Sequence, residues 1–264
     1  MNTNHHVTDW TWLKLLCSTI IATVALEHSQ IDLLISKLFY LNGQWLLEKG
    51  AQPYAFIFYD APKALLILFA IYLMIVLIIK YRWPQSTDSL LNTDSAMNKA
   101  RLNKLLMRLS IREISYLLLV IMIVPATIVT LKSITHVSCP NHLILFGGDV
   151  PYLDLWQSIV AKTPAKCFPA AHASAGFSLY GFAFLPTWRK YRYRVFEAVT
   201  ALGWTMGLYK MLFGDHFFSH TFISMLLSLT IAYILASIFF KGFNRSQNGQ
   251  LKPIRPTLSN TQKR

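Results

Sequence analysis

Charged side chains are scarce in this sequence. Lys, Arg, Asp and Glu together account for 14% of the 264 residues, whereas they make up about 25% of an average soluble domain. Hydrophobic residues reach 54%, and in runs of about 18 to 20 residues they form membrane helices. The shortage of charge therefore disfavours a soluble protein and favours a bundle of membrane helices.

Acidic residues are the scarcer charged type, with 12 Asp and Glu against 25 Lys and Arg and a net charge of +13. Such an excess suits either a nucleic acid or an anionic lipid surface as the partner. The positions of the cations along the chain decide between the two.

Six apolar segments follow one another along the chain, at about 13–26, 64–79, 114–131, 173–185, 195–212 and 221–240. We expect an all-α fold, a polytopic membrane protein with a six-transmembrane-helix bundle, in a single domain over 1–243. The first segment also has features of a signal peptide, but we favour a retained helix. Residues 244–264 are polar and are predicted to form a disordered cytoplasmic tail.

Most of the cations fall in the loops after the second and fourth segments and after the sixth. They are Lys80, Arg82, Lys99, Arg101, Lys104, Arg108, Arg112, Arg189, Lys190, Arg192, Arg194, Lys241, Arg245, Lys252, Arg255, Lys263 and Arg264. The positive-inside rule places these loops and both termini in the cytoplasm, so we expect the lipid bilayer, and no nucleic acid, as the partner. The basic stretch 99–112 suits an amphipathic helix or a solvated connector equally well. Residues 27–62, on the outer side, are expected to include an interfacial helix.

Polar groups mark the four helix ends that this topology brings to the outer interface. Lys132 closes the third segment, Pro169-Ala170-Ala171-His172 opens the fourth, Lys210 lies near the end of the fifth, and His216 and His220 open the sixth. Charges are costly in membrane helices and usually serve a function. The group predicts a site for an anionic lipid headgroup.

Phosphate is the anion that these residues suit. Pro169 fits the first position of a helix and would leave the amides of Ala170 and Ala171 unpaired, as in phosphate-binding helix N-termini. Lys132 and Lys210 would add charge-assisted hydrogen bonds to the phosphate oxygens.

The remaining histidines leave two interpretations. His216 and His220 are spaced i, i+4 on one helical face, so one can orient the imidazole of the other as an activated nucleophile requires. Together with His136 and His142 they could instead suggest zinc, but no familiar zinc spacing accompanies them. We therefore expect a site without a metal and without a cofactor.

In these motifs the sequence resembles the type-2 phosphatidic acid phosphatase superfamily. The motifs of that family read Lys-x6-Arg-Pro, Pro-Ser-Gly-His and Ser-Arg-x5-His-x3-Asp. This chain has Lys132-x6-Cys139-Pro140, then Pro169-Ala170-Ala171-His172, then Lys210-x5-His216-x3-His220, in the same order and spacing. The surrounding residues are similar to a bacterial membrane lipid phosphatase subgroup that has His in place of the last Asp.

The resemblance implies a metal-independent phosphoric monoester hydrolase that forms a phosphohistidine. His216 would attack phosphorus, and His172 would protonate the leaving oxygen as the general acid. The two lysines and the two amides named above would hold the charge on the equatorial oxygens. His220 would accept the proton-bearing nitrogen of His216 and fix its tautomer.

The chain departs from the family pattern at several positions. Cys139 replaces Arg, Ala170 and Ala171 replace Ser and Gly, Lys210 replaces Arg, and His220 replaces Asp. Lys cannot reproduce the two-pronged contact of Arg. A catalytically degenerate relative therefore stays open as an alternative.

Cysteine is also rare, with 3 residues in the chain. Cys17 lies in the first apolar segment and is expected to be a buried apolar residue. Cys139 and Cys167 both lie on the outer side of the membrane, in an oxidising compartment. We predict a disulfide between Cys139 and Cys167, with two free buried thiols as the alternative.

Three classes of function follow. The first is a phosphatase acting on a lipid at the periplasmic face of a bacterial inner membrane, with lipid A, phosphatidic acid, phosphatidylglycerol phosphate or a polyprenyl (di)phosphate as substrate. The second is a phosphotransferase that uses the same phosphohistidine. The third is a non-catalytic lipid-phosphate-binding or transport protein. No obligate protein partner is inferred.

Overall fold

The computed structural model describes residues 10–82 and 108–240. Its helices are α1 (Thr11–Glu27), α2 (Ile31–Phe39), α3 (Ala61–Arg82), α6 (Ile111–Thr135), α7 (Leu155–Ala161), α8 (Ala171–Phe177), α9 (Arg192–Met211) and α10 (Phe218–Phe239). A π-helical turn at Phe56–Asp60 precedes α3, and short 3₁₀ helices lie at Pro140–His142, Ile144–Phe146, Ser178–Phe184 and Pro186–Tyr191. The predicted tail 244–264 and most of the basic stretch 99–112 lie outside the described residues.

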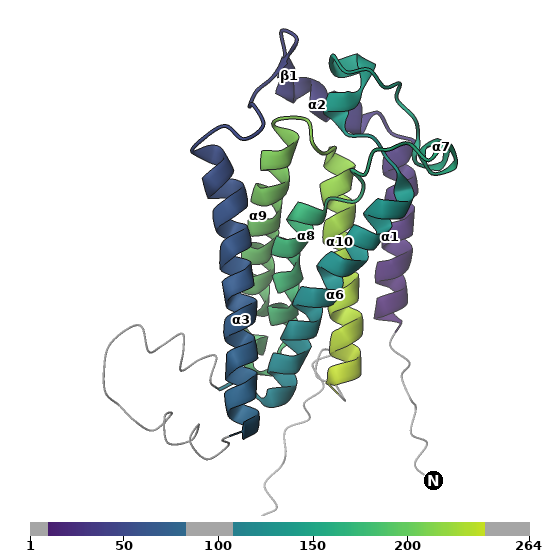
Figure 1. The fold of residues 1–264 in the computed structure, drawn as a ribbon. Coiled ribbons are helices and arrows are strands. Elements are labelled where there is room, and N and C mark those ends of the chain that lie inside the picture. Colours follow the sequence, from purple (N-terminus) through teal and green to yellow (C-terminus); the bar gives the residue numbers. More distant parts are fainter. Residues whose placement is uncertain (1–9, 83–107, 241–264) are drawn as a thin grey trace, which may run out of the picture.

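The long helices run side by side in one bundle (Figure 1). Helix α10 packs against α1, α6 and α8, while α8 also packs against α9, and α3 against α6. The C-terminal ends of α6 and α9 and the N-terminal ends of α8 and α10 lie at the upper end of the bundle in Figure 1, where α2 and α7 also lie. This end of the bundle carries the predicted site.

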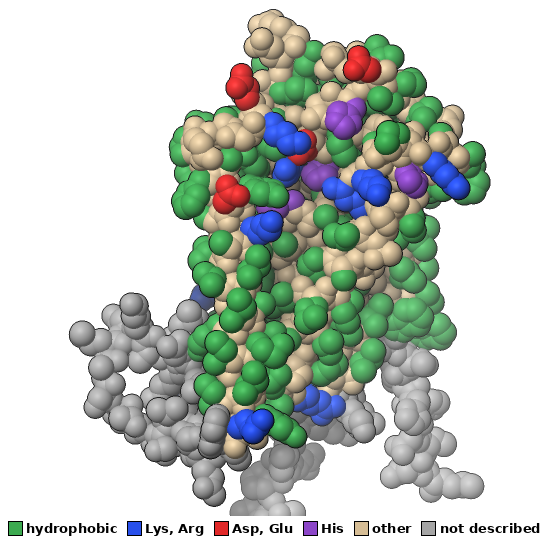
Figure 2. Space-filling view, in the orientation of Figure 1, with side chains coloured by type: hydrophobic (Ala, Val, Ile, Leu, Met, Phe, Trp, Pro, Cys, Tyr) green, Lys and Arg blue, Asp and Glu red, His purple; other side chains and the backbone are tan. Residues whose placement is uncertain are grey.

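Within the described residues, three helices are long and apolar enough to cross a membrane, over Phe56–Arg82, Ile111–His142 and Phe218–Phe239. They correspond to the second, third and sixth predicted segments. Figure 2 shows apolar side chains along the shaft of the bundle, with Lys and Arg side chains at both of its ends. Helices α1 and α9 lie at the first and fifth predicted positions.

The fourth predicted segment, 173–185, is not one continuous α-helix in the structure. Helix α8 begins at Ala171 and ends at Phe177, and the chain continues as a 3₁₀ helix over Ser178–Phe184. Small residues let this element approach its neighbours closely, since a Cβ atom at Gly176 would lie 2.9 Å from the sulfur of Met206.

A short antiparallel hairpin, β1 (Tyr40–Leu41) and β2 (Gln44–Trp45), adds a feature that the all-α prediction lacks. Asn42 and Gly43 form its turn, both with positive φ (51° and 79°), and Asn-Gly is the strongest short-range hairpin signal. Trp45 lies over the loop before α10, where a Cβ atom on Gly214 would come within 2.4 Å of its ring. The predicted interfacial helix within 27–62 corresponds to α2.

Candidate active site

Five predicted residues come together at the upper end of the bundle. Lys132 lies near the end of α6, His172 in the first turn of α8, Lys210 in the last turn of α9, His216 in the loop before α10 and His220 in the first turn of α10. Basic and histidine side chains gather at this end in Figure 2. They lie close enough to act on one another. Besides burial, which has the largest effect, Lys132, Lys210 and His172 all lower the pKa of His216.

Lys210 is held in place by a carboxylate and two aromatic rings. Its Nζ atom lies 3.0 Å from Oδ2 of Asp215, 4.7 Å from the ring centroid of Tyr59 and 4.9 Å from that of Phe213. Asp215 also accepts a hydrogen bond from the side-chain amide of Asn141 at 3.3 Å. Because an ammonium group has three donors, Lys210 can contact an anion without leaving Asp215.

His172 is positioned by the π-helical turn before α3. Its Nε2 atom donates to the carbonyl of Phe58 at 3.3 Å, and its ring stacks on Tyr59 with centroids 4.4 Å apart. Burial above all, and then the charges of Lys210 and Lys63, lower the pKa of His172 to about 4. A bound phosphate would raise that pKa, since an anion favours the imidazolium.

His216 is buried, with 5% of its surface exposed. Burial, followed by the charges of Lys132 and Lys210, holds the pKa of His216 well below 6.5. A neutral imidazole at neutral pH is the form in which histidine acts as a nucleophile. The electrostatics of the site therefore suit attack by His216 on phosphorus.

The prediction of a direct hydrogen bond between His216 and His220 is wrong. Their rings meet edge to face with centroids 5.7 Å apart, and Nδ1 of each has no hydrogen-bond partner among the described residues. The backbone of Cys167 lies beside both imidazoles. The reason is that α10 begins at Phe218, so His216 lies in a loop and does not share the helical face on which the i, i+4 prediction depended.

The prediction that the Ala170 amide is unpaired and free to bind phosphate is also wrong. Ala170 donates its N–H to the carbonyl of His220 at 3.1 Å, and α8 begins one residue later, with Pro169 outside it. That bond joins α8 to the first turn of α10. The first-turn amides, beginning with Ala171, keep the orientation in which an α-helix has no internal acceptor for them.

Residues 113–243 match the family model of the PAP2 superfamily. The chain belongs to this superfamily. The resemblance found in the motifs is thereby confirmed, and membership supports phosphatase or phosphotransferase activity on a phosphate-containing substrate. No curated protein and no solved structure matches the chain.

A disulfide between Cys139 and Cys167 links the first two motifs of this PAP2 protein. Their Cα atoms lie 5.3 Å apart, within the range that a disulfide spans. The backbone N–H of Cys167 donates to the carbonyl of Val137 at 2.9 Å. Cys17 is exposed on α1, contrary to expectation.

The other two histidines weighed for zinc lie away from this arrangement. His136 ends α6 in a left-handed conformation, with φ of 55°, and its Nδ1 atom bonds to the carbonyl of Thr163 at 2.7 Å. His142 is exposed in the loop that follows. His136 thus has a structural contact of its own.

Sequence reasoning missed several residues of the PAP2 site. Asp215 adjoins His216 and lies five positions after Lys210, so its place next to the third motif was an available signal. Phe58 and Tyr59 come from a segment without a recognisable motif, and only the fold brings them to His172. The hydrogen bond and the ring contact of His172 are therefore both supplied from outside the region that matches the family.

Proposed function

We propose that this PAP2 protein hydrolyses the phosphomonoester or diphosphate headgroup of a membrane lipid, through a phosphohistidine on His216. The observation that carries the proposal is a buried His216 with a lowered pKa, within electrostatic reach of two lysines and of His172. A neutral nucleophile beside two cations and a second imidazole is the combination that phosphoryl transfer needs.

The reaction proceeds in two displacements. The unprotonated ring nitrogen of His216 attacks phosphorus while the ester P–O bond breaks, and His172 gives its proton to the leaving lipid oxygen. A water molecule then attacks the phosphohistidine and gives a proton to His172. Inorganic phosphate leaves, and both imidazoles return to their starting states.

The two lysines stabilise the charge that the phosphoryl group carries between the attacking nitrogen of His216 and the leaving oxygen. Lys132 and Lys210 come from α6 and α9, so a phosphate between these helices meets cations on two sides. Asp215 holds Lys210 in advance, which spares the reaction the cost of ordering that side chain.

A lipid substrate suits the place of the site. In the part of the chain that the structure describes, three helices are long and apolar enough to cross a membrane. The site lies at one end of the bundle (Figure 1), where the headgroups of a bilayer would meet water. We infer from the distribution of cations that this end faces the periplasm of a bacterial inner membrane. Lipid A, phosphatidic acid, phosphatidylglycerol phosphate and polyprenyl (di)phosphates share the phosphate that these residues contact.

The decisive measurement is phosphate release by the purified full chain from a panel of these four lipids. We expect His216→Ala and His172→Ala to lower the rate by at least about 10³-fold and about 10²-fold respectively. His142→Ala is the matched control, because His142 is an exposed histidine in an outer loop, and its rate should equal that of the wild type.

Each alternative has its own outcome. Full activity in His216→Ala would contradict the phosphohistidine mechanism. Formation of a lipid diphosphate without net release of phosphate would identify a phosphotransferase. A folded protein that binds lipid phosphate but turns over none of the four lipids would be a degenerate member of the superfamily.

A further inference from the structure

The first turn of α10 lacks a cap from its own sequence. Helix α10 begins at Phe218, and its N-cap residue is Phe217, whose side chain makes no capping hydrogen bond. The first amides of a helix have no acceptor within the helix and need one from elsewhere. This turn contains His220 and begins two residues after His216, so its placement governs two residues of the site.

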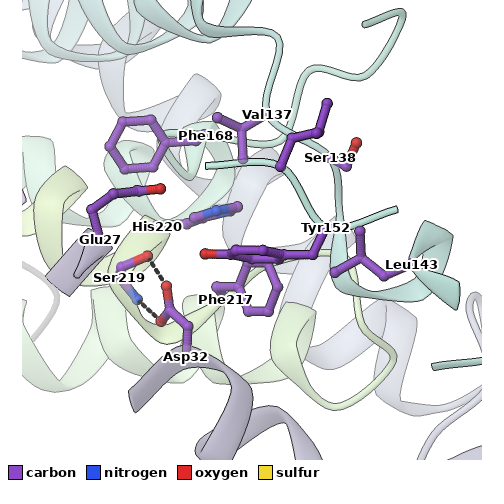
Figure 3. Close-up of a pocket in the computed structure, with 11 residues that line it drawn as sticks. Glu27, Asp32, Val137, Ser138, Leu143, Tyr152, Phe168, Phe217, Ser219 and His220 are labelled. Carbon is purple, nitrogen blue, oxygen red and sulfur yellow. Dashed lines mark hydrogen bonds between the residues drawn. The ribbon is translucent and has the colours of Figure 1, made fainter. Parts of the chain in front are cut away.

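Asp32 supplies the missing acceptor from α2. Its Oδ1 atom accepts the backbone N–H of Ser219 at 2.8 Å, and its Oδ2 atom accepts the Ser219 hydroxyl. Figure 3 shows both bonds beside the imidazole of His220. Asp32 and Ser219 are 9% and 8% exposed, so water competes little for these bonds, and a carboxylate at a helix N-terminus is favoured by the helix dipole.

The contacts around His220 transmit this restraint to the site. Its ring packs edge to face on Phe168 and Phe217, with centroids 5.3 Å away in each case. Its carbonyl accepts the N–H of Ala170 from the start of α8. A shift of the first turn of α10 would therefore displace His220, loosen the segment before α8 and move the loop that carries His216.

We propose that Asp32 is a positioning residue of the phosphate site, which fixes His216 and His220 by holding Ser219 in the first turn of α10. The inference rests on the proposed phosphatase function. Helix α2 lies outside the region that matches the family, 113–243, so the residue that orders the third motif comes from the part of the chain that precedes that match.

Glu27 offers a matched control for Asp32. Both residues line one cavity, together with Tyr152 and His220 (Figure 3). Its Oε1 atom accepts the backbone N–H of Leu155, the first residue of α7, at 2.6 Å. Glu27 thus makes the same kind of bond to a helix that carries none of the site residues.

The experiment compares kcat and KM for phosphate release by full-length variants in detergent. Asp32→Leu should lower kcat by about tenfold or more, because small displacements of reacting groups are costly. KM should stay within about threefold, since Lys132 and Lys210 are held by other helices. Asp32→Asn can accept the Ser219 N–H and donate to its hydroxyl, and should keep kcat within about threefold, as should Glu27→Met.

Hydrogen exchange of the backbone amides of residues 218–221 provides a readout without turnover. We expect faster exchange in Asp32→Leu and wild-type exchange in Glu27→Met. Should Asp32→Leu fail to fold, Ser219→Ala removes one of the two bonds and should lower kcat about three- to tenfold.

Several results would overturn the proposal. They are a folded Asp32→Leu variant with wild-type kcat, an equal loss of kcat in Glu27→Met, or unchanged exchange at 218–221. A wild-type protein without activity on any lipid would overturn the phosphatase function instead, and the exchange measurement would still decide whether Asp32 orders α10.

Discussion

His172 combines two properties at the scale of a single residue, a firm position and a low proton affinity. The carbonyl of Phe58 and the ring of Tyr59 hold its imidazole, and burial lowers its pKa to about 4. A general acid must carry a proton when substrate binds. The protonated form of His172 is therefore a minor species at neutral pH.

This property predicts the pH dependence of catalysis. Above its pKa, the protonated fraction of His172 grows about tenfold for each unit by which the pH falls. His216 stays neutral over the same range because its pKa is also well below 6.5. We expect kcat/KM to rise as the pH is lowered from about 8.5 to about 7, above the titration of the phosphate monoester near pH 6.

The measurement is a pH profile of kcat/KM with one lipid phosphate, with the His142→Ala variant as the control. Both proteins should give the same slope. A flat profile, or one that falls toward pH 7, would show that His172 does not enter the reaction as the protonated acid.

Single residues also show where sequence reasoning stopped. Lys132, Lys210 and the histidines could be named in advance because charged and polar groups are unusual at the ends of apolar segments. The contacts that these residues make with one another could not be predicted. The spacing of His216 and His220 indicated one helical face, but the start of α10 at Phe218 turned the first of them into a loop residue.

Close contact between α9 and α10 is the feature to test at the scale of elements. A Cβ atom at Gly207 would lie 2.3 Å from Cγ2 of Thr221, and Thr221 adjoins His220. Gly207→Val should lower the unfolding free energy by about 1–3 kcal/mol. It should also reduce kcat, because the helices that carry Lys210 and His220 would be pushed apart.

Thermal unfolding in detergent and phosphate release measure the two effects of Gly207→Val. Ala201→Val is the control, since Ala201 lies on the exposed side of the same helix and should change neither quantity. Equal unfolding temperatures for the two variants would contradict the close packing of α9 on α10.

The elements themselves were partly predictable. Apolar runs located helices because burial in lipid or protein requires long apolar stretches, and the capping box of Ser110 and Glu113 starts α6 close to the predicted position. The change from α to 3₁₀ after Phe177 was not predictable, since it depends on small residues packed against other helices. The Asn42-Gly43 pair is a sequence signal for the hairpin, but it lies between apolar segments whose pattern indicates helices.

At the scale of the whole molecule, the Cys139–Cys167 disulfide joins the first motif to the second, across 28 positions of the chain. Closing a loop of this length stabilises a protein by about 3.6 kcal/mol in the chain-entropy model. We expect Cys139→Ala/Cys167→Ala to lose about this much unfolding free energy. Activity should fall as well, because the backbone of Cys167 lies beside His216 and His220.

Chemical unfolding and phosphate release, each for the double variant and for Cys17→Ala, test this prediction. Cys17 is free and exposed on α1, so its variant should match the wild type. A double variant with wild-type stability and activity would show that the disulfide supports neither the fold nor the site.

The bond between Asp32 and Ser219 also bears on how the protein is made. Its partners are separated by 187 positions in the chain, and α1 packs along the same last helix, α10. During synthesis, the carboxylate of Asp32 cannot make its bonds to Ser219 until α10 has emerged from the ribosome. The N-terminal helices can therefore reach their final arrangement only when α10 is in place, and a chain that stops before residue 219 would lack the group that Asp32 contacts in the folded protein.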